Sequence, residues 1–381
     1  MVPRGFHVHT GRAGVANDGR DDFAVLVSDV PAVVSGMFTR SRFAGPSVVL
    51  SRSACADFSA RGVVVLSRNA NVATGAIGLA NANEVRAGVG KALGVLPDEL
   101  LIASTGVIGV EYPMADIRAA IDELTYPTGT DFPAAATAIM TTDTRPKVIS
   151  VPCGDATIVG IAKGVGMIEP NMATMLAFFC TDAELAASDL DRIFRSVVAR
   201  TFNAVSVDTD TSTSDSAVIF ANGQAGPVSE SEFEQPLYDA ALHLVKEIAS
   251  DGEGASKLIE VRLTGARDTA QAKRVAKAIV NSPLVKTAVH GGDPNWGRVA
   301  MAIGKCEDEL DIDQDKVTIG FADFEVYPSR PDAATMTRLT EHLNGNEVLI
   351  RVDLGIASGE FTVYGCDLTN GYVHINSAYT T

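Results

Sequence analysis

The stretch that most constrains the fold of this 381-residue chain is GIAKGVGMIEPNMATMLAFFCTD, residues 160–182. Lys163 stands in its glycine-rich first part, a Pro-Asn pair then breaks the chain, and the apolar run Met172–Cys180 follows. Nine residues with one polar side chain, Thr174, suit a fully buried strand, although periodicity alone does not distinguish it from a buried helix. We therefore expect a loop that leads directly into an element of the core.

Thr174 allows two interpretations from its chemistry alone. The common one is a core hydroxyl that donates to a nearby carbonyl oxygen. The other is a nucleophile, which needs a base beside it because a threonine hydroxyl is weak at its free pKa. A cut immediately before Thr174 would supply such a base, since a free α-amine has a pKa of about 7.7–8.0 and is partly neutral at pH 7.

Six sequence blocks resemble those of the ornithine acetyltransferase (glutamate N-acetyltransferase) family, and they occur in the family's order. The central block, KGVGMIEPNMATML, is similar to the site at which those enzymes cut themselves, and the matching bond is Ala173–Thr174. The other five are STGVIG (104–109), MTTDT (140–144), SDGEGA (250–255), HGGDPNWGR (290–298) and NSAYTT (376–381). One block would be weak support, but six in register across most of the chain are specific. Within the family, the chain resembles in particular the members found in clavulanic-acid gene clusters.

The resemblance implies a mixed α/β fold of layered sheets flanked by helices. It also implies acetyl transfer from N2-acetyl-L-ornithine to L-glutamate by a ping-pong mechanism. The chain would cut itself into an α chain, residues 1–173, and a β chain, residues 174–381, and Thr174 would then carry the acetyl group. Thr105 and Gly106 would form the oxyanion hole, where preorganised donors stabilise the developing charge by several kcal/mol. The implied substrate-binding residues are Thr141, Lys163, Thr174, Glu253, Asn376 and Thr381.

Partners and cofactors follow from the same resemblance. Lys163 suits a substrate carboxylate and Glu253 suits the ammonium group of ornithine, although Glu253 alone would be interpreted as an exposed acid in a turn. No metal or organic cofactor is implied, because the acetyl group travels on Thr174. The α and β chains are expected to stay associated, as α2β2 or a larger assembly.

The charge and cysteine content narrow the class of protein. The net charge of −16 argues against a nucleic-acid or anionic-membrane partner, because such partners are bound by clustered Lys and Arg. No apolar run approaches the roughly 18 residues of a membrane span, and the first residues lack the apolar segment of a signal peptide. The five cysteines are odd in number and form no CxxC pair, which favours inert thiols in a reducing cytoplasm.

Strand and helix patterns mix without strict alternation, which independently favours layered sheets with helices outside. The acidic, turn-rich stretch 224–235 is the best boundary between an N-terminal α/β domain, 1–225, and a C-terminal one, 226–381. Further patterns predict strands at Val48–Leu50, Val317–Val326 and Val373–Asn376, and a helix capped by Asn83 that runs to about Leu96.

Other motifs give no competing assignment. VDTDTSTSDS (207–216) lacks the glycine and glutamate of a calcium loop, so it is interpreted as a polar loop that lines the site. His290 remains open as a general base, although a lone histidine is more often structural. Two alternatives to the acetyltransferase also remain: a self-processing aminopeptidase that uses water as the acceptor, and an uncut, non-catalytic binding protein.

Overall fold

A computed structural model describes residues 1–16, 18–169 and 175–378, and these form two compact units. The first unit contains Met1–Asn203 and Thr211–Leu244, and the second contains Ala204–Asp210 and continues from Val245. The division therefore falls inside one continuous helix, α6 (Glu230–Ser250). The domain boundary expected between residues 225 and 226 stays a prediction.

The described strands of the first unit form one bent sheet in the order β4-β3-β2-β9-β7-β6-β5, with β1 paired to β2. They are β1 (Phe6–Gly11), β2 (Phe23–Phe38), β3 (Ser59–Asn69), β4 (Leu100–Val107), β5 (Lys147–Cys153), β6 (Ala156–Lys163), β7 (Leu176–Glu184) and β9 (Ser216–Pro227). The long strand β2 belongs to both halves of the sheet. Its first residues pair with β3, its last residues pair with β9, and the register shifts between Val27 and Ala32.

The apolar core of the first unit lies between the two halves of this sheet. Leu26, Val63 and Leu101 from one half share a buried cluster with Ile161 and Phe178 from the other. Helix α4 (Phe132–Ala138) contributes to the same cluster, and α1 (Pro46–Ala54) packs at its edge.

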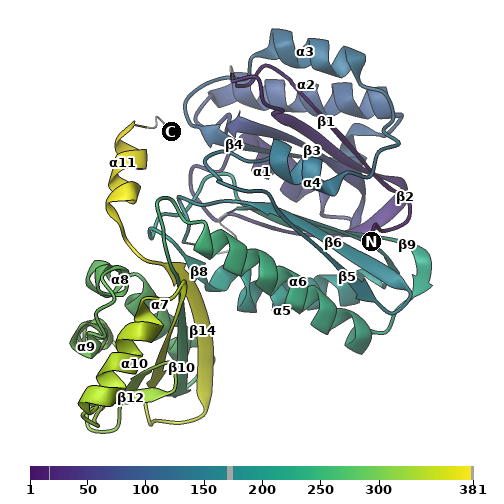
Figure 1. The fold of residues 1–381 in the computed structure, drawn as a ribbon. Helices are drawn as coiled ribbons and strands as arrows, with labels where there is room; N and C mark the ends of the chain where they lie inside the picture. Colours follow the sequence, from purple (N-terminus) through teal and green to yellow (C-terminus); the bar gives the residue numbers. More distant parts are fainter. Residues whose placement is uncertain (17, 170–174, 379–381) are drawn as a thin grey trace. The chain divides into compact units, whose positions relative to one another are not determined.

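Helices cover the outer faces of the first unit's sheet (Figure 1). α2 (Gly75–Leu93) and α3 (Met114–Glu123) pack on the β3–β4 half. α5 (Ala187–Arg200) packs on the other half, where Phe194 meets Phe179 of β7 edge-to-face with ring centroids 6.1 Å apart. The predicted class, layered sheets flanked by helices in a mixed α/β fold, is confirmed.

The second unit has a sheet in the order β12-β11-β13-β10-β14-β8 within its described residues. Its strands are β8 (Val205–Ser206), β10 (Leu258–Ala266), β11 (Thr318–Phe321), β12 (Phe324–Tyr327), β13 (Glu347–Asp353) and β14 (Gly359–Cys366). Its remaining helices are α7 (Thr269–Val280), α8 (Pro283–His290), α9 (Trp296–Gly304), α10 (Ala333–Leu343) and α11 (Asn370–Ala378). Alternate residues of β10 and β13, such as Val261 and Ile350, pack against α7 and α10, so the sheet's polar side chains lie on the opposite face.

Four local predictions were wrong. Val48–Leu50 lies in helix α1, where Pro46 occupies the first turn and the buried residues follow helical spacing. Val373–Asn376 lies in helix α11, which has no buried side chain to produce the alternation of a half-buried strand. Val317–Val326 is two strands rather than one, because Ala322 adopts φ +48° in a tight turn between them. Helix α2 begins at Gly75 rather than after Asn83, since its buried face already includes Gly78 and Ala82.

No helix among the described residues combines the length and apolar character that a membrane crossing requires.

Candidate active site

The predicted cleavage site is followed directly by a buried strand. The bond Ala173–Thr174 and the terminal Thr381 lie outside the described residues. Met175 is covalently joined to Thr174, and its carbonyl accepts a 2.9 Å hydrogen bond from the Ser216 N–H. Strand β7 begins at the next residue and is buried along all but its last residue. In the sequence, the predicted nucleophile therefore precedes the first residue of a core strand by two positions.

Four neighbouring strands have residues paired side by side at the start of β7. Leu176 of β7 pairs with Lys163 of β6 on one side and with Ser216 of β9 on the other. Ser216 in turn pairs with Phe38 at the end of β2. Lys163, predicted to bind a substrate carboxylate, thus lies on the strand next to the one that Thr174 precedes.

Thr105 and Gly106 lie near the end of β4, beside Ser67 and Arg68 of β3. Gly106 has φ +132°, in the left-handed region that favours glycine. A Cβ at this position would lie 2.1 Å from the carbonyl carbon of Arg68. Glycine is therefore required here by close backbone approach, whatever its role in catalysis.

The structure brings Lys163 and Thr105 together. Lys163 is 7% exposed, and its Nζ donates to Thr105 Oγ1 across 3.5 Å. Because the hydroxyl oxygen accepts from the ammonium group, the hydroxyl hydrogen can be donated to another acceptor. This arrangement suits a donor to a developing negative charge.

Asp143 is a buried acid beside these residues that the sequence interpretation did not select. Its Oδ1 accepts from the Gly164 N–H and from Lys147 Nζ, each at 2.8 Å, and its Oδ2 accepts from the Thr141 N–H at 3.1 Å. Burial by itself would raise the pKa of Asp143, but the charges of Lys163 and Lys147 and these hydrogen bonds hold the pKa below its usual value. Thr141, a predicted substrate-binding residue, is thus fixed by a carboxylate that also interacts with Lys163. The available signal was the single acid in the MTTDT block.

Asp215 is a second buried acid that the sequence interpretation missed. It directly precedes Ser216, and its backbone carbonyl accepts from the Thr39 N–H at 3.0 Å. Its Oδ2 is buried and has no hydrogen-bond partner among the described residues. Burial raises the pKa of Asp215 well above its usual value, against smaller opposing effects of Ser212 and Lys163.

Two predicted substrate-binding residues meet in the second unit. Asn376 Nδ2, on α11, donates to Glu253 Oε2 at 2.8 Å. The start of α11 packs closely on Gly254, because a Cβ there would lie 2.4 Å from the Tyr372 nitrogen. Thr369 Oγ1 also donates to the Gly254 carbonyl at 2.6 Å. The glycine after Glu253 thus allows the close approach of the helix that carries Asn376.

His290, left open as a general base, is held by a buried carboxylate. Its Nδ1 lies 2.9 Å from Asp367 Oδ2. Asp367 also accepts from the backbone N–H groups of Ser256 and Lys257, at 2.7 and 2.9 Å. These contacts tie the loop that follows Glu253 to the end of β14, which supports a structural role for His290.

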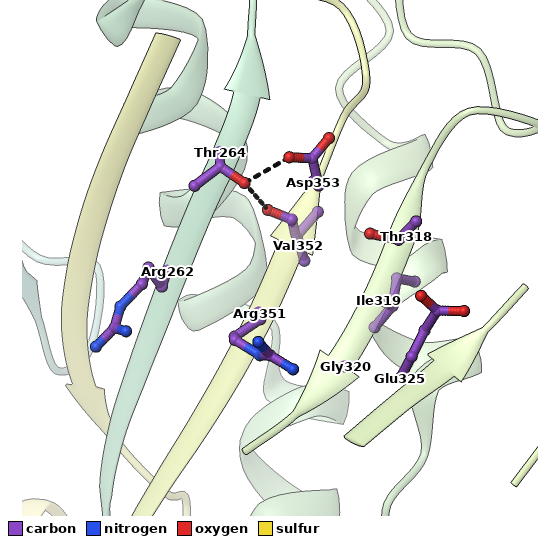
Figure 2. Close-up of a pocket in the computed structure, with 9 residues that line it drawn as sticks. All are labelled: Arg262, Thr264, Thr318, Ile319, Gly320, Glu325, Arg351, Val352 and Asp353. Atoms are coloured by element: carbon purple, nitrogen blue, oxygen red, sulfur yellow. Dashed lines mark hydrogen bonds between the residues drawn. The ribbon is translucent and has the colours of Figure 1, made fainter. Parts of the chain in front are cut away.

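A groove of about 380 Å³ lies on the polar face of the second sheet (Figure 2). It is lined by Arg262, Thr264, Thr318, Ile319, Gly320, Glu325, Arg351, Val352 and Asp353. Thr264 Oγ1 donates to Asp353 Oδ2 at 2.7 Å and to the Val352 carbonyl at 3.5 Å, the two dashed lines in Figure 2. Because no described residue of the predicted site lines this groove, it is not part of the candidate active site.

Comparison with known proteins decides the family. The sequence profile of the ArgJ family matches residues 7–381, nearly the whole chain. The chain belongs to the ArgJ family. The family predicted from the six sequence blocks is thereby confirmed.

Full-length relatives of this ArgJ-family chain are enzymes by name. It is 66% identical over 386 residues to "Glutamate N-acetyltransferase Oat2" of Streptomyces clavuligerus, with 100% of this chain and 98% of the relative covered. It is 57% identical over 381 residues to "Arginine biosynthesis bifunctional protein ArgJ" of Rhodococcoides fascians, with 100% and 94% covered. The crystal structure of the Bacillus halodurans ArgJ is similar at 39% identity and a TM-score of 0.49, covering 52% of this chain and 96% of that chain. The ArgJ-family chain is an acyltransferase, and the roles of its individual residues stay predictions.

Proposed function

We propose that this acyltransferase moves an acetyl group from N2-acetyl-L-ornithine to L-glutamate and that Thr174 carries the group between them. The names of the full-length relatives support acetyl transfer, glutamate and arginine biosynthesis. The observation that carries the assignment to this site is the contact between Lys163 Nζ and Thr105 Oγ1. It joins the predicted oxyanion hole to the residue that pairs with Leu176, two residues after Thr174.

The first step is self-cleavage at Ala173–Thr174. Thr174 Oγ attacks the Ala173 carbonyl carbon, the C–N bond breaks, and the nitrogen takes a proton equivalent to the one that the hydroxyl loses. Water then hydrolyses the new ester. The products are a chain that ends in a carboxylate at Ala173 and a chain that begins with the free amine of Thr174.

The second step is transfer of the acetyl group to the enzyme. The Thr174 amine accepts the hydroxyl proton while the oxygen attacks the acetyl carbonyl of N2-acetyl-L-ornithine. The Thr105 hydroxyl and the Gly106 N–H donate to the oxygen that becomes negatively charged. Ornithine leaves with the proton from the Thr174 ammonium group, and the acetyl ester remains. The amine of glutamate then attacks this ester and reverses the sequence, so the scheme needs no metal or organic cofactor.

Charged side chains of the predicted set are assigned to the charged ends of the substrates. Lys163 would bind a carboxylate. Thr141 would lie near it, because the Thr141 N–H donates to Asp143 and the charge of Lys163 also interacts with Asp143. Glu253 would bind the side-chain ammonium group of ornithine, and Asn376 would orient that carboxylate through its 2.8 Å hydrogen bond. Thr381 completes the predicted set.

Assembly and location also belong to the proposal. The two chains would remain together as α2β2 or a larger assembly, in the cytoplasm. The cysteines are all free thiols, which suits a reducing compartment.

Mass spectrometry tests the proposal directly. Purified protein should contain a chain that begins Thr174-Met175-Leu176. Incubation with N2-acetyl-L-ornithine and no acceptor should add one acetyl group to that chain, at Thr174. An acetyl group on another residue, or sequential kinetics without an acetylated enzyme, would overturn the mechanism.

Variants of Thr174 supply the controls. Thr174→Ala should remain one chain and transfer no acetyl group, because it lacks the attacking oxygen. Thr174→Ser should still be cut and still transfer, more slowly, since the missing methyl group leaves the side chain less restricted. Acetate release at the same rate with and without glutamate would instead indicate a hydrolase.

A further inference from the structure

A separate groove in the first unit collects positive charge. Its volume is about 590 Å³, within the 300–1,000 Å³ typical of small-molecule sites. It is lined by Gly36, Met37, Phe38, Thr39, Arg40, Ser41, Arg42, Arg52 and Arg195. Four arginines therefore line one groove of a chain whose net charge is −16. We call this the arginine groove.

The four arginines differ in their partners. Arg52 donates to the Thr39 carbonyl at 2.8 Å, and Arg195 donates to a carboxylate on its own helix, Asp191 Oδ2, at 2.7 Å. Arg40 and Arg42 are exposed, and neither side chain has an ion pair or hydrogen bond with the described parts of the chain. The groove thus presents two guanidinium groups that no carboxylate of the described residues neutralises.

The loop that carries these two arginines is anchored at Thr39 to the segment 212–215. Thr39 Oγ1 donates to the Ser212 carbonyl at 2.8 Å, and the Thr39 N–H donates to the Asp215 carbonyl at 3.0 Å. The Ser41 N–H donates back to Thr39 Oγ1 at 3.1 Å. A loop that is already fixed loses less conformational freedom when a ligand binds, so Arg40 and Arg42 are partly preorganised.

We propose that the arginine groove binds a small ligand that carries two adjacent phosphate groups. A guanidinium group is planar and matches one phosphate with two parallel hydrogen bonds, so Arg40 and Arg42 suit two phosphates. Arg52 and Arg195 add positive potential at the walls. A compact anion fits better than a nucleic acid, because the acidic remainder of the chain repels an extended polyanion.

Two sources could supply such a ligand: free pyrophosphate or a nucleoside diphosphate. Phe43 follows Arg42 directly and is 69% exposed. An exposed aromatic ring next to phosphate-binding residues can stack on a nucleobase. Comparison of pyrophosphate with ADP therefore distinguishes the two sources.

Isothermal titration calorimetry on the full-length protein tests the proposal. Inorganic pyrophosphate should bind at least about tenfold more tightly than inorganic phosphate, because the second phosphate engages a second arginine. The affinity for pyrophosphate should fall as salt is added, since the arginines are exposed to solvent. Absence of pyrophosphate binding at millimolar concentration would overturn the proposal.

Paired variants place the binding in the groove. Arg40→Ala/Arg42→Ala should weaken pyrophosphate binding about tenfold or more, and Arg40→Lys/Arg42→Lys should weaken it less, because charge remains but the two-pronged contact is lost. Arg12→Ala/Arg118→Ala removes the same charge from exposed arginines of the same unit outside the groove and should leave binding within about twofold. Equal losses in the first and third variants would overturn the proposal, as would full binding by the first.

Comparison of ADP with pyrophosphate, in the wild type and in Phe43→Ala, identifies which of the two ligands is recognised. If ADP binds more tightly than pyrophosphate and Phe43→Ala removes the difference, the ligand is a nucleotide. If the two bind equally and Phe43→Ala has no effect, the phosphate groups alone are recognised, and both results support the proposal. If pyrophosphate does not bind and Arg40→Ala/Arg42→Ala changes the oligomeric mass, the groove is a protein interface and the proposal fails.

Discussion

Lys163 Nζ lies 3.5 Å from Thr105 Oγ1, although 58 residues separate the two in sequence. The contact joins β4 to β6, which are not neighbours in the sheet order. It turns two residues selected by different sequence blocks into one structural pair. Because Lys163 donates to the hydroxyl oxygen, it also orients the hydroxyl hydrogen away from itself, which leads to a first prediction.

Loss of the Thr105 hydroxyl should reduce catalysis more than binding. Thr105→Ala should lower kcat about 100-fold or more with a smaller change in KM, as expected when one oxyanion donor is removed. Thr105→Ser keeps the hydroxyl that accepts from Lys163 and should stay within about tenfold of the wild type. Thr128→Ala, at an exposed position in the same unit, is the control for steady-state kinetics. An unchanged kcat in Thr105→Ala would remove this side chain from the mechanism and leave the Gly106 N–H as the donor.

Gly106→Ala should be far more harmful than Gly109→Ala. Both glycines have positive φ, +132° and +83°, so alanine is strained at either position. At Gly106 the added Cβ would lie 2.1 Å from backbone atoms of Arg68, whereas at Gly109 it meets nothing within 4 Å. We expect Gly106→Ala to lower both kcat and the thermal midpoint, and Gly109→Ala to lower the midpoint slightly with kcat retained. Similar behaviour of the two variants would show that the close approach at β3 does not matter.

The ion pair between Lys147 and Asp143 should be important for stability. Both side chains are fully buried, and Lys147 Nζ lies 2.8 Å from Asp143 Oδ1. Lys147→Met removes one partner and leaves a buried carboxylate, which typically costs about 3–5 kcal/mol. The exposed Lys91→Met should cost about 1 kcal/mol or less. Urea denaturation of the Thr174→Ala chain, expected to remain one polypeptide, measures both values, and equal small losses would contradict the prediction.

Local patterns in the sequence were enough to predict many elements of the fold. The apolar run Met172–Cys180 suited a buried strand, and its part from Leu176 onward lies in β7, which is buried from Leu176 to Ala183. The pattern failed at α11, because Val373 and Ile375 alternate with polar residues as in a short strand, although the helix is exposed.

The two buried acids of the site could not be recognised in the same way. Asp143 and Asp215 each occur in a run of Thr and Ser that is typical of an exposed loop. Segments that are distant in the sequence pack against them. The Gly164 N–H and the charge of Lys163 interact with the carboxylate of Asp143, and the Thr39 N–H donates to the backbone carbonyl of Asp215. The burial of these two acids is visible only in the folded structure, so the sequence alone could not identify them.

Asp215 provides a prediction with a definite sign. Its pKa is raised in the folded state, chiefly by burial, so the folded protein binds the proton more tightly than the unfolded chain does. The stability that this proton contributes is fully present below the usual carboxyl pKa of about 3.9 and is lost as pH rises toward the folded pKa. In that window the wild-type free energy of unfolding should fall by up to about 1.4 kcal/mol per pH unit on account of Asp215.

Asp215→Asn cannot ionise, so its stability relative to the wild type should rise with pH from about pH 4 up to the raised pKa of the folded wild type. Asp191→Asn is a control of opposite sign. Burial would raise the pKa of Asp191, but hydrogen bonds from Arg195 and Ser35 lower it. The stability that Asp191 contributes is therefore present above the usual carboxyl pKa and is lost as pH falls. Asp191→Asn should accordingly be destabilised at neutral pH and approach the wild type in acid.

Urea denaturation at several pH values, in the uncut Thr174→Ala background, measures the stability differences of both Asp215→Asn and Asp191→Asn from the wild type. A pH-independent difference for Asp215→Asn would mean that Asp215 is as accessible to protons in the folded protein as in the unfolded chain, contrary to its burial.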